Sequence, residues 1–307
     1  MADDLGMEFD ESEDELEDGD KAQARAALFE TLETRFSTDI AYSSTINAVG
    51  SALKDKLITN GMTDRQAVGA VNQYRGMWFE DLVVLDWLQA ATGLLKHRAD
   101  ALVAIPMPKR TELELEALWI PDIRELVDRL EQDLKLHGTV MRASNPDLIL
   151  VKASVLARYA PATWTAVNAA DDEQSKVRLI SGIAHELAGQ LGYPELAGVM
   201  SLKTSLRVDR KVQPLQEANR IKALRKYIRT RTWQREDSPF GFFVALMEER
   251  KGKQHSGGAE VFFSNVLLYS IVAIDERPSA AVDGVLRITS TSGLRTAVDL
   301  VHAKLLA

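Results

Sequence analysis

At residues 201–217 the chain reads SLKTSLRVDRKVQPLQE, a strand-like run that passes directly into a helix. Successive side chains of a strand point to opposite faces of a sheet, so Ser201 and Lys203 lie on the same face. A lysine in an otherwise apolar strand has two interpretations. Either it discourages aggregation at the edge of a sheet, or it is a catalytic cation beside a metal.

The helix expected from Pro214 to Arg229 favours the second interpretation. Its apolar stripe contains an acid, because Glu217 lies at helical spacing from Ile221, Leu224 and Ile228. An acidic side chain that faces a core must be paired or metal-bound. The other faces of this helix carry basic residues that either meet phosphates or are simply solvated: Arg220, Lys222, Arg225, Lys226 and Arg229.

Two further carboxylates occupy unusual positions. Glu80 aligns with the apolar side of a helix expected from Met77 to Leu95. Asp147 directly follows Pro146 at the start of a predicted strand, where it can project from the end of a sheet into a cleft. Three carboxylates and a lysine form the set that phosphodiester hydrolysis requires. The carboxylates are hard oxygen ligands for Mg²⁺, and the lysine steadies the attacking water and the developing negative charge.

Helical and strand-like segments are interspersed along the chain, which predicts an α/β or α+β fold with a central mixed β-sheet flanked by helices. We expect helices within residues 21–95 and at 113–136, 174–191, 214–229 and 293–306. Gly192 is expected to close the helix at 174–191. We expect strands at 100–106, 139–143, 147–151 and 197–205, and within 240–247 and 261–274.

Composition excludes several kinds of site. The 307 residues include no cysteine, so disulfides, a thiolate nucleophile and a Cys-ligated zinc site are all ruled out. The five histidines are scattered singly and form no zinc signature. No apolar run is long enough to cross a membrane, and no signal peptide is recognisable, so we expect a soluble cytoplasmic protein without a membrane partner.

The charge is distributed unevenly. The net charge is −8, but residues 1–20 contain eleven acidic residues and no lysine or arginine. The rest of the chain has 34 acidic and 37 basic residues and is mildly basic, as a phosphate-binding protein can be. We therefore predict an acidic disordered tail at 1–20 and a single domain at 21–307.

The motifs above resemble those of the PD-(D/E)xK nucleases, and specifically of the type II restriction endonucleases that recognise sites centred on CCGG. In that group an aspartate follows Asn-Pro, a Ser-x-Lys strand precedes Arg-x-Asp-Arg, and the second catalytic glutamate has moved to the next helix. The matching residues here are Asn145-Pro-Asp147, Ser201-Leu-Lys203, Arg207-Val-Asp-Arg210 and Glu217. Ser201 stands where other members place an acid. The spacing fits the subgroup that cuts Pu-CCGG-Py sites.

The resemblance implies a restriction-endonuclease-like fold and an active site of Asp147, Lys203, Glu217, Glu80 and Ser201. Asp147 and Glu217 would hold Mg²⁺, Lys203 would activate the water or stabilise the transition state, and Glu80 would support the metal site. The partner would be double-stranded DNA with a CCGG-containing palindrome, cut before the first cytosine of the core to leave 5′-CCGG overhangs.

The resemblance also assigns DNA recognition and assembly. Arginine donates two hydrogen bonds to guanine and aspartate accepts from cytosine, so Arg207, Asp209 and Arg210 would read the CCGG core. A surface cluster of ion pairs is the alternative for these three residues. The protein would be a homo-oligomer, either a dimer or a dimer of dimers. Arg231 and Trp233 would lie at a contact between dimers, with core packing as the alternative for Trp233.

Two other functions stay open from the sequence. The first is a related nuclease, such as a repair or junction endonuclease, that responds to DNA structure instead of CCGG content. The second is a sequence-specific DNA-binding protein that does not cleave because its active site has decayed.

Overall fold

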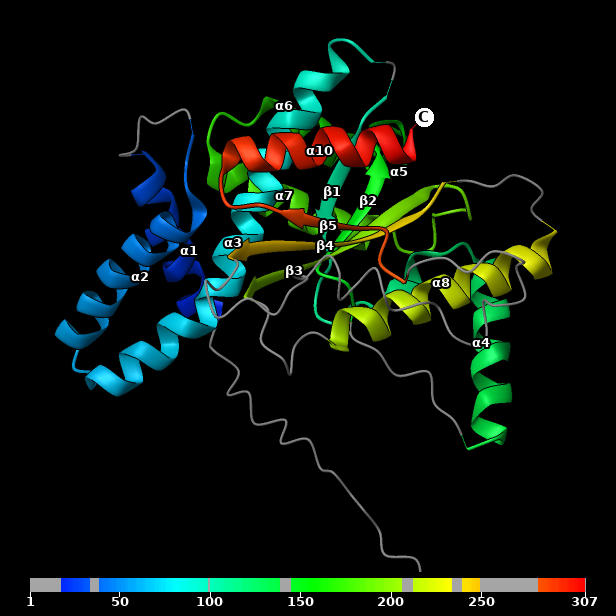
Figure 1. Cartoon of the computed structure of the whole chain (residues 1–307), viewed down its shortest axis with the longest axis horizontal. Coiled ribbons are helices and arrows are strands. Elements are labelled where there is room, and N and C mark those ends of the chain that lie inside the picture. Colours follow the sequence, from blue (N-terminus) through cyan, green and yellow to red (C-terminus); the bar gives the residue numbers. More distant parts are fainter. Residues whose placement is uncertain are drawn as a thin grey trace, which may run out of the picture.

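A five-stranded mixed sheet forms the centre of the structure (Figure 1). The computed structural model describes residues 18–33, 39–98, 100–138, 145–205, 212–233, 239–248 and 281–306. The strands follow one another in chain order: β1 (Leu102–Pro106), β2 (Leu148–Lys152), β3 (Leu196–Ser205), β4 (Gly241–Glu248) and β5 (Gly284–Arg287). The first two pairs are antiparallel and the last two are parallel. The predicted mixed sheet is confirmed.

Helices flank this sheet. They are α1 (Asp18–Glu33), α2 (Tyr42–Thr59), α3 (Asp64–Leu95), α4 (Pro121–Leu136), α5 (Ala153–Tyr159), α6 (Pro161–Ala169), α7 (Glu173–Glu186), α8 (Val212–Thr232) and α10 (Thr291–Leu305), with a short 3-10 helix η1 (Leu115–Leu118). In Figure 1, α10 lies above the strands and α8 below them. A parallel strand pair needs a crossover, and α8 is the helix between the parallel strands β3 and β4.

Helix α3 is 32 residues long, so it extends for about 48 Å. Its start is fixed by a capping box, in which Thr63 and Gln66 satisfy each other's backbone groups. Its second half crosses the core, where the indole nitrogens of Trp78 and Trp87 donate to the Ala24 and Leu102 carbonyls, each at 2.9 Å. The first half runs beside α2, away from the sheet (Figure 1). The sequence predicted only the half from Met77 onwards, because the first half has few apolar residues.

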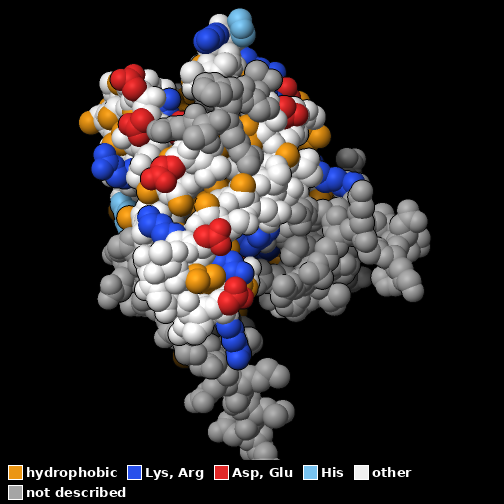
Figure 2. All heavy atoms as spheres, turned by 90° about the vertical axis from the view of Figure 1, so that its left-hand side faces the viewer, with side chains coloured by type: hydrophobic (Ala, Val, Ile, Leu, Met, Phe, Trp, Pro, Cys, Tyr) orange, Lys and Arg blue, Asp and Glu red, His pale blue; other side chains and the backbone are white. Residues whose placement is uncertain are grey.

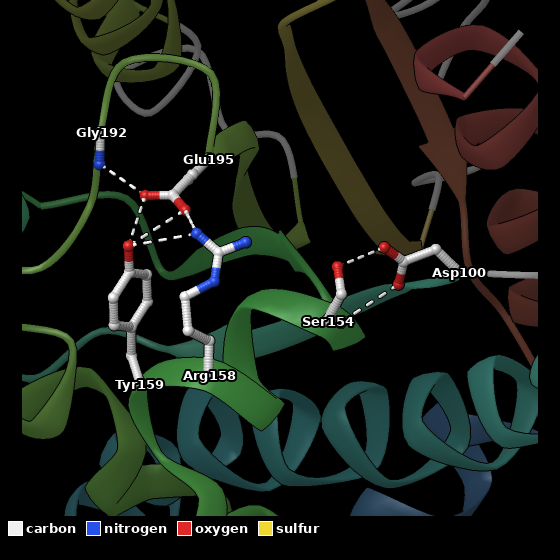
Figure 3. Close-up of polar contacts among 6 residues, drawn as sticks. All are labelled: Asp100, Ser154, Arg158, Tyr159, Gly192 and Glu195. Atoms are coloured by element: carbon white, nitrogen blue, oxygen red, sulfur yellow. Dashed lines mark hydrogen bonds and ion pairs between the residues drawn. The ribbon is translucent and has the colours of Figure 1, made fainter.

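Polar networks close one end of the central strands, next to the start of β3 and the end of β2. Figure 3 shows Glu195 pointing at Arg158, Tyr159 and the Gly192 amide, with Asp100 pointing at Ser154. The Glu195 carboxylate accepts from Arg158 at 2.7 Å and from the Gly192 N–H at 2.7 Å. Asp100 accepts from both the backbone and the hydroxyl of Ser154. These contacts fix α5 and the turn before β3 against the sheet.

The segment before α2 meets the segment before α10. Ala41 forms a β-bridge with Ser290, and the Ser292 amide and hydroxyl each donate to Asp39 at 2.9 Å. Further along α10, the buried His302 accepts a 2.8 Å hydrogen bond from the Leu102 N–H on β1. Helix α10 therefore joins the N-terminal helices to the first strand.

Several element boundaries differ from the prediction. The helix expected at 174–191 ends at Glu186, because Gly189 adopts a φ of +72° and the Leu191 N–H bonds to the Leu118 carbonyl. The short elements α5, α6 and β5 were not predicted from the sequence, and α1 begins at Asp18, inside the predicted acidic tail. The strands expected at 139–143 and 261–274 lie outside the described residues.

No described helix is long and apolar enough to span a bilayer. Figure 2 views the molecule from the side of α1 and α2, where basic, acidic and hydrophobic side chains are interspersed. The described residues on this side do not form the continuous basic surface that a DNA backbone would need.

Candidate active site

A pocket of about 170 Å³ opens at the end of the central strands opposite Glu195. Its lining comes from three parts of the fold that are far apart in sequence. Helix α3 contributes Gly76, Phe79 and Glu80, and α8 contributes Gln213. The sheet side contributes Asp147, just before β2, together with Leu202, Lys203 and Thr204 of β3. The pocket therefore brings together three of the predicted site regions: the helix with Glu80, the turn with Asp147 and the strand with Lys203.

Asp147 is the centre of this pocket. Antiparallel pairing of β2 with β3 places it opposite Ser201, since Leu148 pairs with Met200. Its Oδ2 atom accepts hydrogen bonds from the buried Ser201 hydroxyl at 3.3 Å and from the Leu202 N–H, and the Lys203 ammonium lies 3.7 Å away. One carboxylate oxygen is thus oriented by two donors and a cation.

Hydrogen bonds of Asn145 fix the position of the segment that carries Asp147. Its side-chain amide donates to the Pro108 and Leu113 carbonyls and its oxygen accepts from the Leu115 N–H, with lengths between 2.6 and 3.1 Å. These bonds tie the segment before β2 to the loop after β1. The Asn-Pro-Asp motif therefore combines an anchor with a functional carboxylate.

Glu80 and its neighbour Asp81 behave differently although they are adjacent in α3. Asp81 is buried and forms two hydrogen bonds with the Arg25 guanidinium, at 3.0 and 3.1 Å. Glu80 lines the pocket instead, and burial and the nearby charge of Asp147 raise its pKa well above the usual range. Glu80 and Asp147 therefore form a pair of acids that repel each other and that a cation would stabilise.

Glu217 lies outside the pocket lining in the part of the chain that the structure describes. It is 2% exposed and faces the core with Ile221, Leu224 and Ile228, as its helical spacing predicted. Its Oε1 atom accepts a 3.0 Å hydrogen bond from the Gln213 side chain, which does line the pocket. The structure thus places Glu217 one helical turn from the pocket, with Gln213 between them.

The sequence left open whether the basic residues of α8 meet phosphates or are solvated, and neither alternative holds for three of them. Arg220 is buried and pairs with Glu116 of η1 at 2.9 Å. Lys222 pairs with Asp283 at 2.6 Å. Arg225 lies between the rings of Tyr193 and Phe240, each 4.2 Å from its guanidinium carbon, and burial lowers its pKa to about 10. These three cations fasten α8 to the rest of the fold.

The remaining predicted residues have different outcomes. Arg207, Asp209 and Arg210 lie outside the described residues. Trp233 is 87% exposed, so the alternative that it packs in the core is wrong, and it has a positive φ of 52°. Arg231 is exposed one residue before the end of α8 and stacks on Tyr227 at 5.4 Å.

The donor set of the pocket fits Mg²⁺. This ion prefers hard oxygen ligands and commonly binds through one or two carboxylates while it keeps several waters. Asp147 and Glu80 offer such carboxylates in one pocket. Their charges repel each other, so a bound cation would stabilise the pair. No cluster of three or more acidic or histidine side chains suited to a metal occurs within the described ranges. The site therefore suits a partly hydrated ion and not a closed protein cage.

Gln213 lines the pocket, although it was not predicted from the sequence to be a site residue. The signal was present, because Gln213 lies four residues before Glu217 and side chains at this spacing meet on a helix. Asn145 was used only as part of a motif, and its three hydrogen bonds to a distant loop had no signal in the sequence.

Comparisons with known proteins agree on one family. A family model described as "Cfr10I/Bse634I restriction endonuclease" matches residues 11–303. The chain is 22% identical to the type II restriction enzyme Cfr10I of Citrobacter freundii over 250 residues, which cover 81% of this chain and 83% of that protein. Two solved structures of the restriction endonuclease Bse634I share its fold, each 21% identical and covering 91% of both chains. The TM-score is 0.73 for Bse634I with cognate DNA and 0.69 for the second structure.

Proposed function

The chain belongs to the Cfr10I/Bse634I restriction endonuclease family and is a type II site-specific deoxyribonuclease, and from this premise we propose that it cuts palindromic DNA with a CCGG core in a Mg²⁺-dependent reaction. The proposed site is Pu-CCGG-Py, cut before the first cytosine of the core to leave 5′-CCGG overhangs. The observation that carries the proposal is the convergence of Lys203 and two backbone or hydroxyl donors on Asp147, beside Glu80.

The roles proposed for these residues are those that the resemblance implies. Asp147 and Glu217 would hold the metal, and Glu80 would support it from the α3 side of the pocket. When bound, Mg²⁺ would supply positive charge that stabilises the phosphate as negative charge grows on it. Ser201 and the Leu202 N–H keep the Asp147 carboxylate turned toward the pocket. Ser201 performs this task without adding a further charge to a site that already has two acids.

Lys203 is the proposed cation of the reaction. Its side chain is 11% exposed and its ammonium lies 3.7 Å from Asp147, so it reaches the pocket while remaining partly shielded from water. A positive charge in such a site stabilises developing charge more strongly than it would in bulk solvent. Lys203 therefore orients the attacking water and stabilises the phosphorane-like transition state.

DNA recognition is assigned to Arg207, Asp209 and Arg210, between the end of β3 and the start of α8. The Asp147, Lys203 and Gln213 pocket lies where these two elements approach each other. Residues between them could therefore read bases close to the bond that is cut. A palindromic site requires two such subunits related by a twofold axis.

We also assign Arg231 and Trp233 to a contact between dimers. Trp233 is a large apolar side chain that is 87% exposed at the end of α8, and an aromatic residue of this kind is a common anchor of protein interfaces. Arg231 lies beside it and stacks on Tyr227. Burial of this end of α8 in an assembly would remove the exposed tryptophan from water.

Digestion of a sequenced plasmid with and without Mg²⁺ tests the proposal, with the cut ends read by run-off sequencing. The expected result is a set of discrete Mg²⁺-dependent cuts before the first cytosine of CCGG-centred sites. Cuts governed by DNA structure would instead identify a structure-specific nuclease. Binding without nicking would identify a DNA-binding protein with an inactive site.

A further inference from the structure

Gln213 connects the buried Glu217 carboxylate to the pocket. It lies in the first turn of α8, its side chain is exposed, and it lines the pocket with Asp147 and Lys203. Its Nε2 atom donates a 3.0 Å hydrogen bond to Glu217 Oε1. Glu217 itself is 2% exposed. Gln213 is therefore the described residue that both lines the pocket beside Asp147 and hydrogen-bonds to Glu217.

The local structure of α8 holds the Gln213 and Glu217 side chains next to each other. Gln213 and Glu217 are four residues apart, so their side chains meet on one face of the helix. The next residue, Pro214, is buried and has a fixed backbone φ angle, which restricts the first turn of α8. Further along the helix, Arg220 pairs with Glu116 and Arg225 is clamped between two rings, so the helix that carries both side chains is anchored.

The chemistry of the side chain also suits this position. A glutamine is neutral, so it can stand beside Glu217 and near Asp147 without adding repulsion. Its amide donates to one oxygen of the Glu217 carboxylate and so fixes the rotation of that group. Partners of this kind, which do not themselves hold the metal, commonly set the orientation of the residues that do.

We propose that Gln213 is a positioning residue that holds the Glu217 carboxylate in the orientation needed to share a divalent cation with Asp147. This inference rests on the proposed function, because it presupposes that Glu217 takes part in metal binding. It makes Gln213 a determinant of metal affinity without a direct part in the reaction. No effect of Gln213 on metal-free DNA binding is expected.

The test compares Gln213→Met with Gln216→Met in an otherwise Lys203→Ala protein bound to a CCGG-containing duplex. Methionine keeps the length of glutamine but cannot donate a hydrogen bond, and Gln216 is an exposed neighbour in α8 outside the pocket lining. Binding of MnCl2 is measured by electron paramagnetic resonance, DNA affinity by gel shift in EDTA, and stability by thermal unfolding. The Lys203→Ala background keeps the duplex intact.

Gln213→Met is expected to weaken Mn²⁺ binding by about 10- to 100-fold, the usual effect of losing an orienting partner. The DNA affinity in EDTA and the unfolding temperature should be unchanged, and Gln216→Met should match the parent in all three measurements. Gln213→Ala should weaken Mn²⁺ binding to a similar degree, since it removes the same donor.

The inference is overturned if Gln213→Met binds Mn²⁺ as tightly as the parent. It is also overturned if the DNA affinity in EDTA falls by the same factor, because Gln213 would then act as a DNA contact. The proposed function itself fails if the Lys203→Ala parent binds no Mn²⁺ on DNA and the natural chain does not cut DNA with Mg²⁺. That result would also overturn the role of Gln213, because the role depends on the metal site.

Discussion

The two ends of strands β2 and β3 use the same kinds of side chain in opposite ways. At the end that Figure 3 shows, each carboxylate is satisfied, since Glu195 accepts from an arginine, a tyrosine and a backbone amide. At the other end, burial and the nearby charge of Asp147 together raise the pKa of Glu80 well above its usual range. The contacts at the first end stabilise the fold, whereas the second end brings together two acids, Glu80 and Asp147, whose negative charges repel each other.

This difference helps to separate structural from functional acids. Buried polar groups that only support a fold are normally paired, because an uncompensated charge is costly. A protein keeps a repulsive pair where a ligand supplies the missing charge. Asp81 and Glu80 show the contrast within two consecutive residues, because the Arg25 guanidinium hydrogen-bonds to Asp81, whereas burial and the charge of Asp147 raise the pKa of Glu80.

The largest effect should come from the pocket end. We expect Lys203→Ala to lower the rate of DNA cleavage by about 10²- to 10³-fold, since it removes a charge that acts on the transition state. DNA affinity and stability should remain near those of the natural chain. Single-turnover cleavage assays and gel shifts measure the two quantities. Arg158→Ala at the opposite end is the control and should cut at the normal rate, and near-normal cleavage by Lys203→Ala would refute its role.

Glu195→Gln should affect stability without affecting cleavage chemistry. The Glu195 carboxylate is 14% exposed, whereas Arg158 is 60% exposed and partly screened by water, so the loss should be about 1–2 kcal/mol of unfolding free energy. Urea unfolding measures it. A large fall in cleavage rate at unchanged stability would contradict the assignment of this end to the fold alone.

Glu80→Gln should increase the unfolding free energy, whereas Glu195→Gln should decrease it. A carboxyl whose pKa is raised by folding binds protons more tightly in the folded state, so its ionisation destabilises the fold as the pH rises above its unfolded pKa. Removal of the charge should therefore raise the unfolding free energy at pH 7 by about 1 kcal/mol in the absence of metal, while cleavage falls. Unfolding at pH 5 and pH 8 checks this, because the gain should be larger at pH 8.

The smallest effect concerns His302, which lies in neither network. Burial lowers its pKa, and its Nε2 atom accepts from the Leu102 N–H, so the folded state prefers the neutral ring. Its contribution to stability is present above the unfolded pKa of about 6.5 and is lost as the pH falls below that value. The unfolding free energy of the natural chain should thus decrease between pH 7 and pH 5. His302→Gln should flatten that decrease, and an unchanged slope would contradict the assignment.

Much of this organisation could be predicted from local pattern. The alternation of Ser201 and Lys203 and the helical spacing of Glu217 both describe the structure correctly. Pairing across large separations could not be predicted in the same way. Arg220 and Arg225 look like solvated cations in the sequence, because their partners Glu116 and Tyr193 come from distant segments. The hydrogen bonds that Asn145 forms with a distant loop likewise could not be predicted from the sequence.

The junction of α10 with the N-terminal helices and β1 has a consequence for synthesis of the protein. A ribosome releases α10 after every other described element, yet α10 packs on α3, which carries Glu80, and hydrogen-bonds to β1 through His302. Contacts that join such distant segments form late, because a long loop must close first. A nascent chain that lacks α10 therefore lacks a packing partner of the helix that carries Glu80. The enzyme thus acquires its full framework only after α10 has been translated.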